Sequence, residues 1–247
     1  MKKFLISIVA LSASLIFANP VWVQYEIKVD NPQSTSNIIN ATDKFMASRF
    51  VQENFKGSLH LNAWIANGHS EATHGFAVLQ PSLTAHTQWV AAMNQSKEGQ
   101  EFGSVLRENS SPVFQRINSF LETYGSPSNE DTYWEVHEFS AKPSDVNAIA
   151  RATQKMDQAI KADFPGQFGL SAVSFGSGEV THLLTVGFSS IAELEAWEDS
   201  VPTNKAVQKW LKTLDSLVEW KGSDVLMNAK VYDSASDLET FVTKDFE

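Results

Sequence analysis

The sequence repeats itself, and this internal repeat limits the possible folds more than any other feature. A segment that begins at Trp22 is similar to one that begins at Trp134, and further matches follow in the same order at offsets between 108 and 112 residues. Such self-similarity predicts a duplicated structural unit. The matched residues include Trp22 and Trp134, Glu26 and Glu138, His74 and His182, Trp89 and Trp197, Phe102 and Trp210, and, at the largest offset, Ser111 and Ser223.

The repeat divides the chain into two units of about a hundred residues each, a common domain size. We expect the first unit at residues 20–122 and the second at residues 132–232. Between them, the segment 122–131 contains Gly125, Ser126 and Pro127, a composition typical of a linker.

Both units show the same succession of hydrophobic patterns. Segments rich in β-branched and aromatic residues predict strands, and apolar residues three and four positions apart predict helices. The order β-α-β-β-α-β defines the ferredoxin-like unit, an α+β fold with a four-stranded antiparallel sheet. Strands are expected at 22–29, 59–65, 76–79 and 113–121, then at 133–141, 168–175, 182–188 and 225–232; helices are expected at 37–54, 82–93 continued by 100–106, 144–162, and 190–200 continued by 205–218.

A single ferredoxin-like unit leaves one face of its sheet bare, and two units on one chain can cover each other sheet to sheet. The helical segments also carry a repeated pattern, Ser82, Trp89, Ser96 and Phe102 in the first unit and Ser190, Trp197, Asn204 and Trp210 in the second. This pattern resembles the dimeric α+β barrel superfamily, which includes antibiotic-biosynthesis-type monooxygenases, stress-responsive barrel proteins and haem-handling enzymes. The resemblance implies an intrachain pseudo-dimeric α+β barrel, with a lumen between the two sheets.

The N-terminus has the features of a bacterial secretory signal peptide at residues 1–18. Lys2 and Lys3 precede an apolar run from Phe4 to Phe17, and Ala18 stands at the expected cleavage point. We therefore expect a periplasmic or secreted protein with no membrane association after cleavage; a retained anchor is the alternative. At the other end, the acidic segment 233–247 contains a short amphipathic stretch, and we expect a loose tail rather than a docking helix.

Charge and cysteine content exclude several classes of function. The net charge is −10, and removal of the two lysines of the signal segment, which has no acidic residue, takes it to −12. A protein of this charge repels phosphate backbones, so nucleic acid is not expected as a partner. The sequence has no cysteine, which excludes disulfides, thiolate catalysis and cysteine-based metal sites.

Candidate ligand-binding residues come from the alternation of side chains along the strand at 59–65. His60, Asn62 and Trp64 lie on one face, and Leu59, Leu61, Ala63 and Ile65 lie on the other. If the sheets close, the first set lines the lumen and the second packs under the helices; if they do not close, the first set is exposed. Tyr25 and His137 hold matching places on the first strands, and we expect them to line a pocket together with Trp64.

The candidate residues are of types that can take part in acid–base chemistry, but they form no diagnostic sequence motif. A neutral histidine can act as a general base, and a tyrosine can donate to a carbonyl oxygen, although a structural role is the commoner one for a single strand histidine. The matching Glu26 and Glu138 are candidates for a perturbed pKa if they are buried. Nucleotide-binding glycine motifs, a nucleophile elbow and a paired-histidine metal helix are absent from the sequence.

We therefore expect a small-ligand-binding or interaction module, with an apolar or aromatic small molecule as the ligand. No catalytic residue, metal or cofactor is assigned, and self-association into a homo-oligomer is left open. The resemblance implies the alternative, a cofactor-independent monooxygenase or a haem-handling enzyme in which His60, Trp64, Tyr25 and His137 shape the pocket. In such oxygenases the substrate supplies the electrons, so the lack of a metal motif does not exclude this activity.

Overall fold

The computed structural model describes residues 20–68, 70–125, 131–161, 164, 166–176 and 178–233. The signal segment expected at residues 1–18 lies outside the described residues, as does the acidic tail beyond Asp233.

The described chain forms two successive units with the expected order of elements. The first unit contains β1 (Val21–Val29), α2 (Pro32–Met46), α3 (Arg49–Asn54), β2 (Ser58–Ala66), β3 (His74–Gln80), α4 (Leu83–Gln95), α5 (Lys97–Asn109) and β4 (Ser110–Gly125). The second contains β5 (Tyr133–Ala141), α6 (Val146–Ile160), β6 (Gln167–Phe175), β7 (His182–Phe188), α7 (Ile191–Ser200), α8 (Lys205–Leu214) and β8 (Val218–Asp233).

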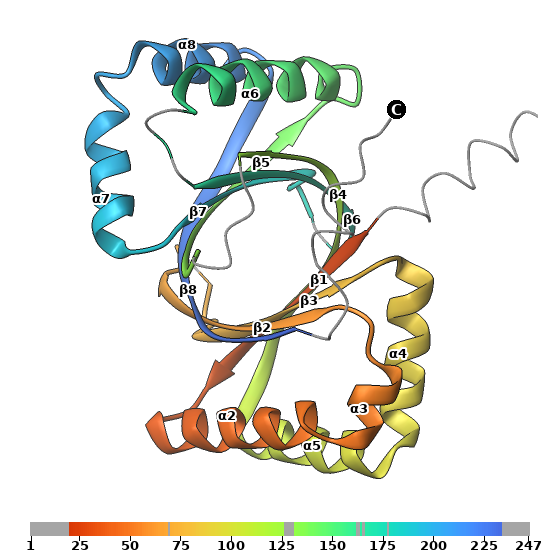
Figure 1. The fold of residues 1–247 in the computed structure, drawn as a ribbon. Coiled ribbons are helices and arrows are strands. Elements are labelled where there is room, and N and C mark those ends of the chain that lie inside the picture. Colours follow the sequence, from red (N-terminus) through yellow and green to blue (C-terminus); the bar gives the residue numbers. More distant parts are fainter. Residues whose placement is uncertain are drawn as a thin grey trace, which may run out of the picture.

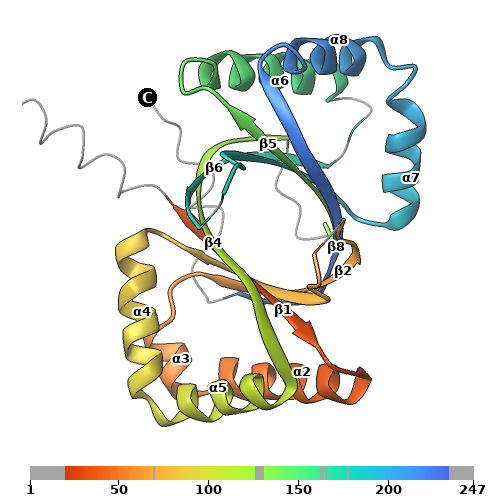
Figure 2. The ribbon, with the colours of Figure 1, turned by 180° about the vertical axis from the view of Figure 1, so that it is seen from behind.

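The eight strands close into one barrel in the order β1-β3-β2-β8-β5-β7-β6-β4. Each half contributes four strands, and the halves join where β2 pairs with β8 and where β4 pairs with β6, in both places antiparallel. In Figure 1 the strands form a ring, with the helices of the two units outside it on opposite sides, and Figure 2 shows the same arrangement from behind. The predicted pseudo-dimeric α+β barrel is confirmed.

The polar residues of the repeated helical pattern cap the helices. Ser82 accepts a hydrogen bond from the backbone N–H of Ala85 at the start of α4, and its counterpart Ser190 accepts one from Glu193 at the start of α7. Ser96 and Asn204 do the same at the start of α5 and α8. Side chains of this kind stabilise a helix because they satisfy N–H groups that the first turn leaves unpaired.

Three apolar clusters hold the barrel together. Two lie between a sheet and its helices: one is built around Trp89 in the first half, the other around Trp197 in the second. The third lies in the lumen, where Trp22, Leu183 and Leu226 are buried. The bare faces of the two sheets therefore cover each other, as the sequence predicts.

The closing strands differ from the expectation. β4 and β8 begin at Ser110 and Val218, earlier than predicted. Glu26 pairs with Phe114 and its counterpart Glu138 pairs with Gly222, so these strands correspond at an offset of 108 residues. The match of Ser111 to Ser223 is therefore wrong. Both pairings contain a bulge directly after the glutamate, and one inserted residue changes the register in a way that the hydrophobic pattern does not reveal.

Candidate functional site

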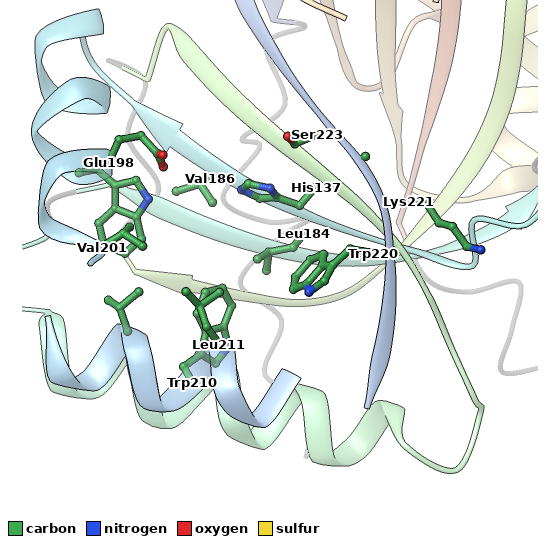
Figure 3. Close-up of a pocket in the computed structure, with 13 residues that line it drawn as sticks. His137, Leu184, Val186, Glu198, Val201, Trp210, Leu211, Trp220, Lys221 and Ser223 are labelled. Atoms are coloured by element: carbon green, nitrogen blue, oxygen red, sulfur yellow. The ribbon is translucent and has the colours of Figure 1, made fainter. Parts of the chain in front are cut away.

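A cleft of about 540 Å³ lies in the second half of the barrel, between the sheet and the helices α7 and α8 (Figure 3). Its floor comes from β5, β7 and β8. Because the helices α7 and α8, which form its other side, lie outside the barrel, the cleft lies on the outer face of the sheet and not in the lumen. The residues that line it are His137, Leu184, Val186, Trp197, Glu198, Val201, Val207, Trp210, Leu211, Trp220, Lys221, Gly222 and Ser223.

Three tryptophans dominate the walls, and two of them are anchored by their N–H groups. The indole of Trp210 donates to Thr153 Oγ1 on α6 at 3.2 Å, and that of Trp220 donates to Asp215 Oδ1 at 3.0 Å. These bonds fix the orientation of two indole rings; Trp220 is the most exposed of the three tryptophans, whereas Trp197 and Trp210 present only a small part of their rings to the cleft. The cleft is therefore suited to a flat apolar molecule.

The polar side chains that line the cleft are those of His137, Glu198, Lys221 and Ser223, and the buried carboxyl group of Glu135 lies next to His137. His137 Nε2 lies 3.4 Å from Oε2 of Glu135, a buried residue two positions earlier on β5. Glu198, on α7, reaches the same region, and Figure 3 shows its carboxyl group on the side of the cleft toward His137. Burial raises the pKa of Glu198, and repulsion from Glu135 adds to the effect. The arrangement can therefore hold a proton or accept one from a ligand.

The corresponding region of the first half has a different content. Tyr25 stands where His137 stands, since Tyr25 pairs with Phe76 as His137 pairs with Leu184. Its hydroxyl group is 3.0 Å from Nε2 of His86 on α4. Burial raises the pKa of Tyr25 to about 12 and lowers the pKa of His86, so a neutral tyrosine faces a neutral histidine.

In the first half, phenylalanine rings stack on the two aromatic residues that correspond to Trp197 and Trp210 of the cleft. Phe45 stacks on Phe102, the counterpart of Trp210, at 4.7 Å between ring centroids. Phe50 stacks on Trp89, the counterpart of Trp197, at 5.4 Å. Both copies keep aromatic packing on this tryptophan, since the ring of Phe164 lies 4.8 Å from Trp197 and that of Phe55 lies 4.8 Å from Trp89. The second copy differs in that a ligand-sized cleft lies beside these rings.

The structure separates the five candidate ligand-binding residues that the sequence groups together. Trp64 packs against the lumen cluster, and Asn62 is buried on the same face of β2. His60 also belongs to this face and makes a hydrogen bond of 2.6 Å with Ser58 Oγ.

Tyr25 and His137, by contrast, lie under the helices, so the expectation that they line a pocket with Trp64 is wrong. Side chains alternate along a strand, and Trp22 occupies the lumen from β1, which turns Tyr25 outward. Of the five predicted residues, His137 lines the cleft.

The cleft escapes prediction from the sequence because its walls look like ordinary core. Core packing is the usual role of a helix-borne tryptophan such as Trp197, and Trp197 does bury most of its surface. A signal is present in the differences between the copies: Glu198 stands where the first copy has Val90, and His137 where it has Tyr25. Polar residues that replace apolar ones under a helix layer indicate a site rather than a core.

Within the part of the chain that the structure describes, no cluster of three or more histidine, aspartate or glutamate side chains is arranged to hold a metal ion. In the same residues, no helix has the length and apolar character needed to cross a membrane.

Comparison with known proteins supports the fold. No protein-family model and no curated protein sequence matches the chain. Among solved structures, a proposed monooxygenase from Lactobacillus acidophilus NCFM matches with a TM-score of 0.63 at 11% identity, over 87% of this chain and 97% of that one.

Two further structures extend this comparison. An anthrone oxidase-like protein matches with a TM-score of 0.62 at 14% identity, over 90% of this chain and 95% of the other. A haem-binding protein from Thermus thermophilus matches with a TM-score of 0.54 at 10% identity, over 86% of this chain and 92% of that one. Together with the closed eight-stranded topology, these matches define the class: the chain has the dimeric α+β barrel fold, with both halves on one polypeptide.

Proposed function

We propose that the protein binds a small, flat, largely apolar aromatic molecule in the cleft between the second sheet and the helices α7 and α8. The observation that carries the proposal is the cleft itself. Its volume of about 540 Å³ falls within the range of small-molecule sites, its walls are tryptophan rings, and its polar groups are few and lie close together. A hydroxyl or carbonyl group on the ligand would meet His137.

A second candidate function, cofactor-independent oxygenation of such a molecule, is favoured by the pairing of His137 with Glu135. Glu135 Oε2 lies 3.4 Å from His137 Nε2 and can orient the imidazole, as the partner of a general base does. Removal of a proton from an anthrone-type substrate leaves an electron-rich anion that can react with O₂. The balanced reaction turns a ring methylene group into a carbonyl group, and the second oxygen atom leaves as water, with all electrons supplied by the substrate.

Haem is the alternative ligand because one matching structure is a haem-binding protein. The residues of this cleft do not fit it. Lys221, which could meet a propionate group, already forms ion pairs with Glu179 at 2.9 Å and Glu219 at 2.7 Å. Glu198 adds negative charge where two propionates would need cations. No step is therefore derived through haem.

The binding proposal can be tested with anthrone as the probe and the quenching of tryptophan fluorescence as the signal. Leu211→Trp places a large ring in the cleft, and we expect it to weaken anthrone binding at least tenfold. Gly103→Trp is the matched control, because Gly103 holds the equivalent position on α5 and a Cβ atom added there comes close only to the flexible end of Arg107. Unchanged binding in Leu211→Trp, or equal losses in the two variants, would contradict the proposal.

Oxygenation is tested in the same preparation. Wild type should consume O₂ in the presence of anthrone, and His137→Gln should lose most of this activity while it still binds anthrone. Binding without O₂ consumption would leave a binding protein and reject the second candidate. A haem titration completes the set, and we expect it to give no shifted Soret band.

We further propose that the protein acts outside the cytoplasm. This proposal is supported by the sequence of residues 1–18, in which two lysines precede an apolar run that ends at Phe17 and Ala18 stands at the expected cleavage point. Mass measurement of the protein recovered from a bacterial periplasmic fraction should give the mass of a chain that begins at Asn19; recovery of the full-length chain in the membrane fraction would indicate a retained anchor.

A further inference from the structure

A second group of polar residues lies in the barrel lumen, apart from the cleft. Glu26 on β1, Arg116 on β4, Glu138 on β5 and Asp224 on β8 form what we call the barrel-end cluster. Arg116 Nη1 donates to Glu138 Oε1 at 2.5 Å, and Arg116 Nε donates to Gln24 Oε1 at 2.9 Å. The cluster unites both halves, because Glu26 and Glu138 are counterparts and so are Arg116 and Asp224.

The cluster is short of positive charge. It contains three carboxyl groups and one guanidinium group, and Arg116 is paired directly with Glu138. Glu26 accepts hydrogen bonds from Gln24 Nε2 at 2.8 Å and from Ser70 Oγ at 3.3 Å, both neutral donors. Burial is the main cause that raises the pKa of Glu26 and of Asp224, and repulsion from Glu138 contributes to both. A further cation would therefore stabilise the ionised carboxyl groups of Glu26 and Asp224.

Buried polar atoms without partners point to a ligand rather than to a closed structural network. Arg116 is only 2% exposed, yet its Nη2 group has no hydrogen-bond partner. Asn62, 6% exposed on the lumen face of β2, has no partner for its Oδ1 atom. Arg116 Nη2 is a donor and Asn62 Oδ1 an acceptor, so a molecule that satisfies both must offer one acceptor and one donor, as an amine with a hydroxyl group does.

Aromatic rings lie beside these groups, and solvent reaches them. The ring of Phe114 is 5.7 Å from the guanidinium carbon of Arg116, and the indole of Trp64 lies close enough to Asp224 to act on its carboxylate. Phe114 is 36% exposed and the Glu138 side chain 24% exposed, so solvent reaches the cluster at this end of the barrel. Aromatic faces next to carboxylates are suited to organic cations.

We propose that the barrel-end cluster binds a protonated organic amine that also carries a hydroxyl group and a small aromatic group. The ammonium group donates to Glu26, Asp224 and Asn62 Oδ1, the hydroxyl oxygen accepts from Arg116 Nη2, and the aromatic group packs against Phe114 and Trp64. A bare divalent ion fits less well, since it needs about six oxygen ligands and the described residues contain no such group of carboxylates.

The probe for this site is 2-amino-1-phenylethanol, with the neutral 1-phenylethane-1,2-diol as the matched control ligand. Calorimetric titration of the wild-type chain should show binding of the amine and at least tenfold weaker binding of the diol. Asp224→Asn and Glu26→Gln should each weaken amine binding at least tenfold. Glu53→Gln, an exposed acidic residue on α3 paired with Arg49, should bind as wild type does.

The variant Leu211→Trp separates this site from the cleft. The amine should bind Leu211→Trp with unchanged affinity, whereas loss of binding there would place the amine in the cleft and overturn the proposal. Equal binding of amine and diol, unchanged binding in both Asp224→Asn and Glu26→Gln, or no binding to the wild-type chain would also overturn it. The result is independent of whether anthrone binds.

Discussion

At the scale of single residues, the alternation of side chains along a strand decides which residues face the lumen and which face the helices. On β1, Trp22 points into the lumen and Tyr25 points under the helices. The alternation along its strand is sufficient to place Trp64 on the face opposite to Leu59 and Leu61, and closure of the two sheets makes that face the lumen. Alternation is not sufficient to place His137 and Glu198 in one cleft, because their proximity depends on how α7 packs on the sheet, which local patterns do not encode.

Burial of His182 predicts a pH dependence of stability at this scale. Burial lowers the pKa of His182 in the folded protein. The unfolded chain therefore binds a proton more readily below the ordinary histidine value of about 6.5, and this contribution to stability is present above that pH and lost as the pH falls through it.

We expect thermal unfolding curves to show this loss as a difference between two proteins. On going from pH 7.5 to pH 5.5, wild type should lose more stability than His182→Gln. The comparison with a variant removes the opposite effect of carboxyl groups such as Glu26, whose raised pKa stabilises the fold as the pH falls. Parallel pH profiles for the two proteins would mean that His182 titrates normally in the folded state.

At the scale of elements, capping residues explain why the two copies share a polar pattern despite low similarity elsewhere. Ser82 and Ser190 occupy the same position before α4 and α7, and each accepts a bond from the backbone three residues on. These caps make the helix starts predictable from the sequence. The bulges that follow Glu26 and Glu138 have no comparable local signal, and this is why the sequence does not reveal the register of β4 and β8.

Removal of a cap gives an element-scale prediction. Ser82→Ala leaves the Ala85 N–H of α4 without its side-chain acceptor, and we expect the free energy of unfolding to fall by about 1 kcal/mol. Denaturant unfolding measures the change. Thr84→Ala, an exposed substitution in the first turn of the same helix, serves as the control and should change stability by less than about 0.5 kcal/mol. Equal effects would show that Ser82 does not act as a cap.

At the scale of the whole molecule, the internal repeat explains why the two sheets close into one barrel. Neither sheet can bury its lumen face alone, and the pairings of β2 with β8 and of β4 with β6 leave both sheets without a free edge. Because closure requires only two similar halves, residues elsewhere are free to diverge. This freedom accounts for a cleft in the second half where the first half has stacked phenylalanine rings.

Because each sheet depends on the other to cover its lumen face, we expect that one half of the chain alone does not form a stable folded monomer. A chain of residues 20–125 would expose the lumen face around Trp22 and the unpaired edges of β2 and β4. We expect light scattering after size-exclusion chromatography to show self-association or aggregation. A monodisperse monomer of this half with cooperative unfolding would show that each sheet is stable on its own.

The most direct measurement of the central claim is a crystal structure of the protein soaked with anthrone. We expect a flat ligand in the second half, stacked against the tryptophan walls of the cleft and with its oxygen atom within hydrogen-bond distance of His137. A ligand bound beside Tyr25 in the first half, or a cleft whose tryptophan rings close on one another and admit no ligand, would contradict it.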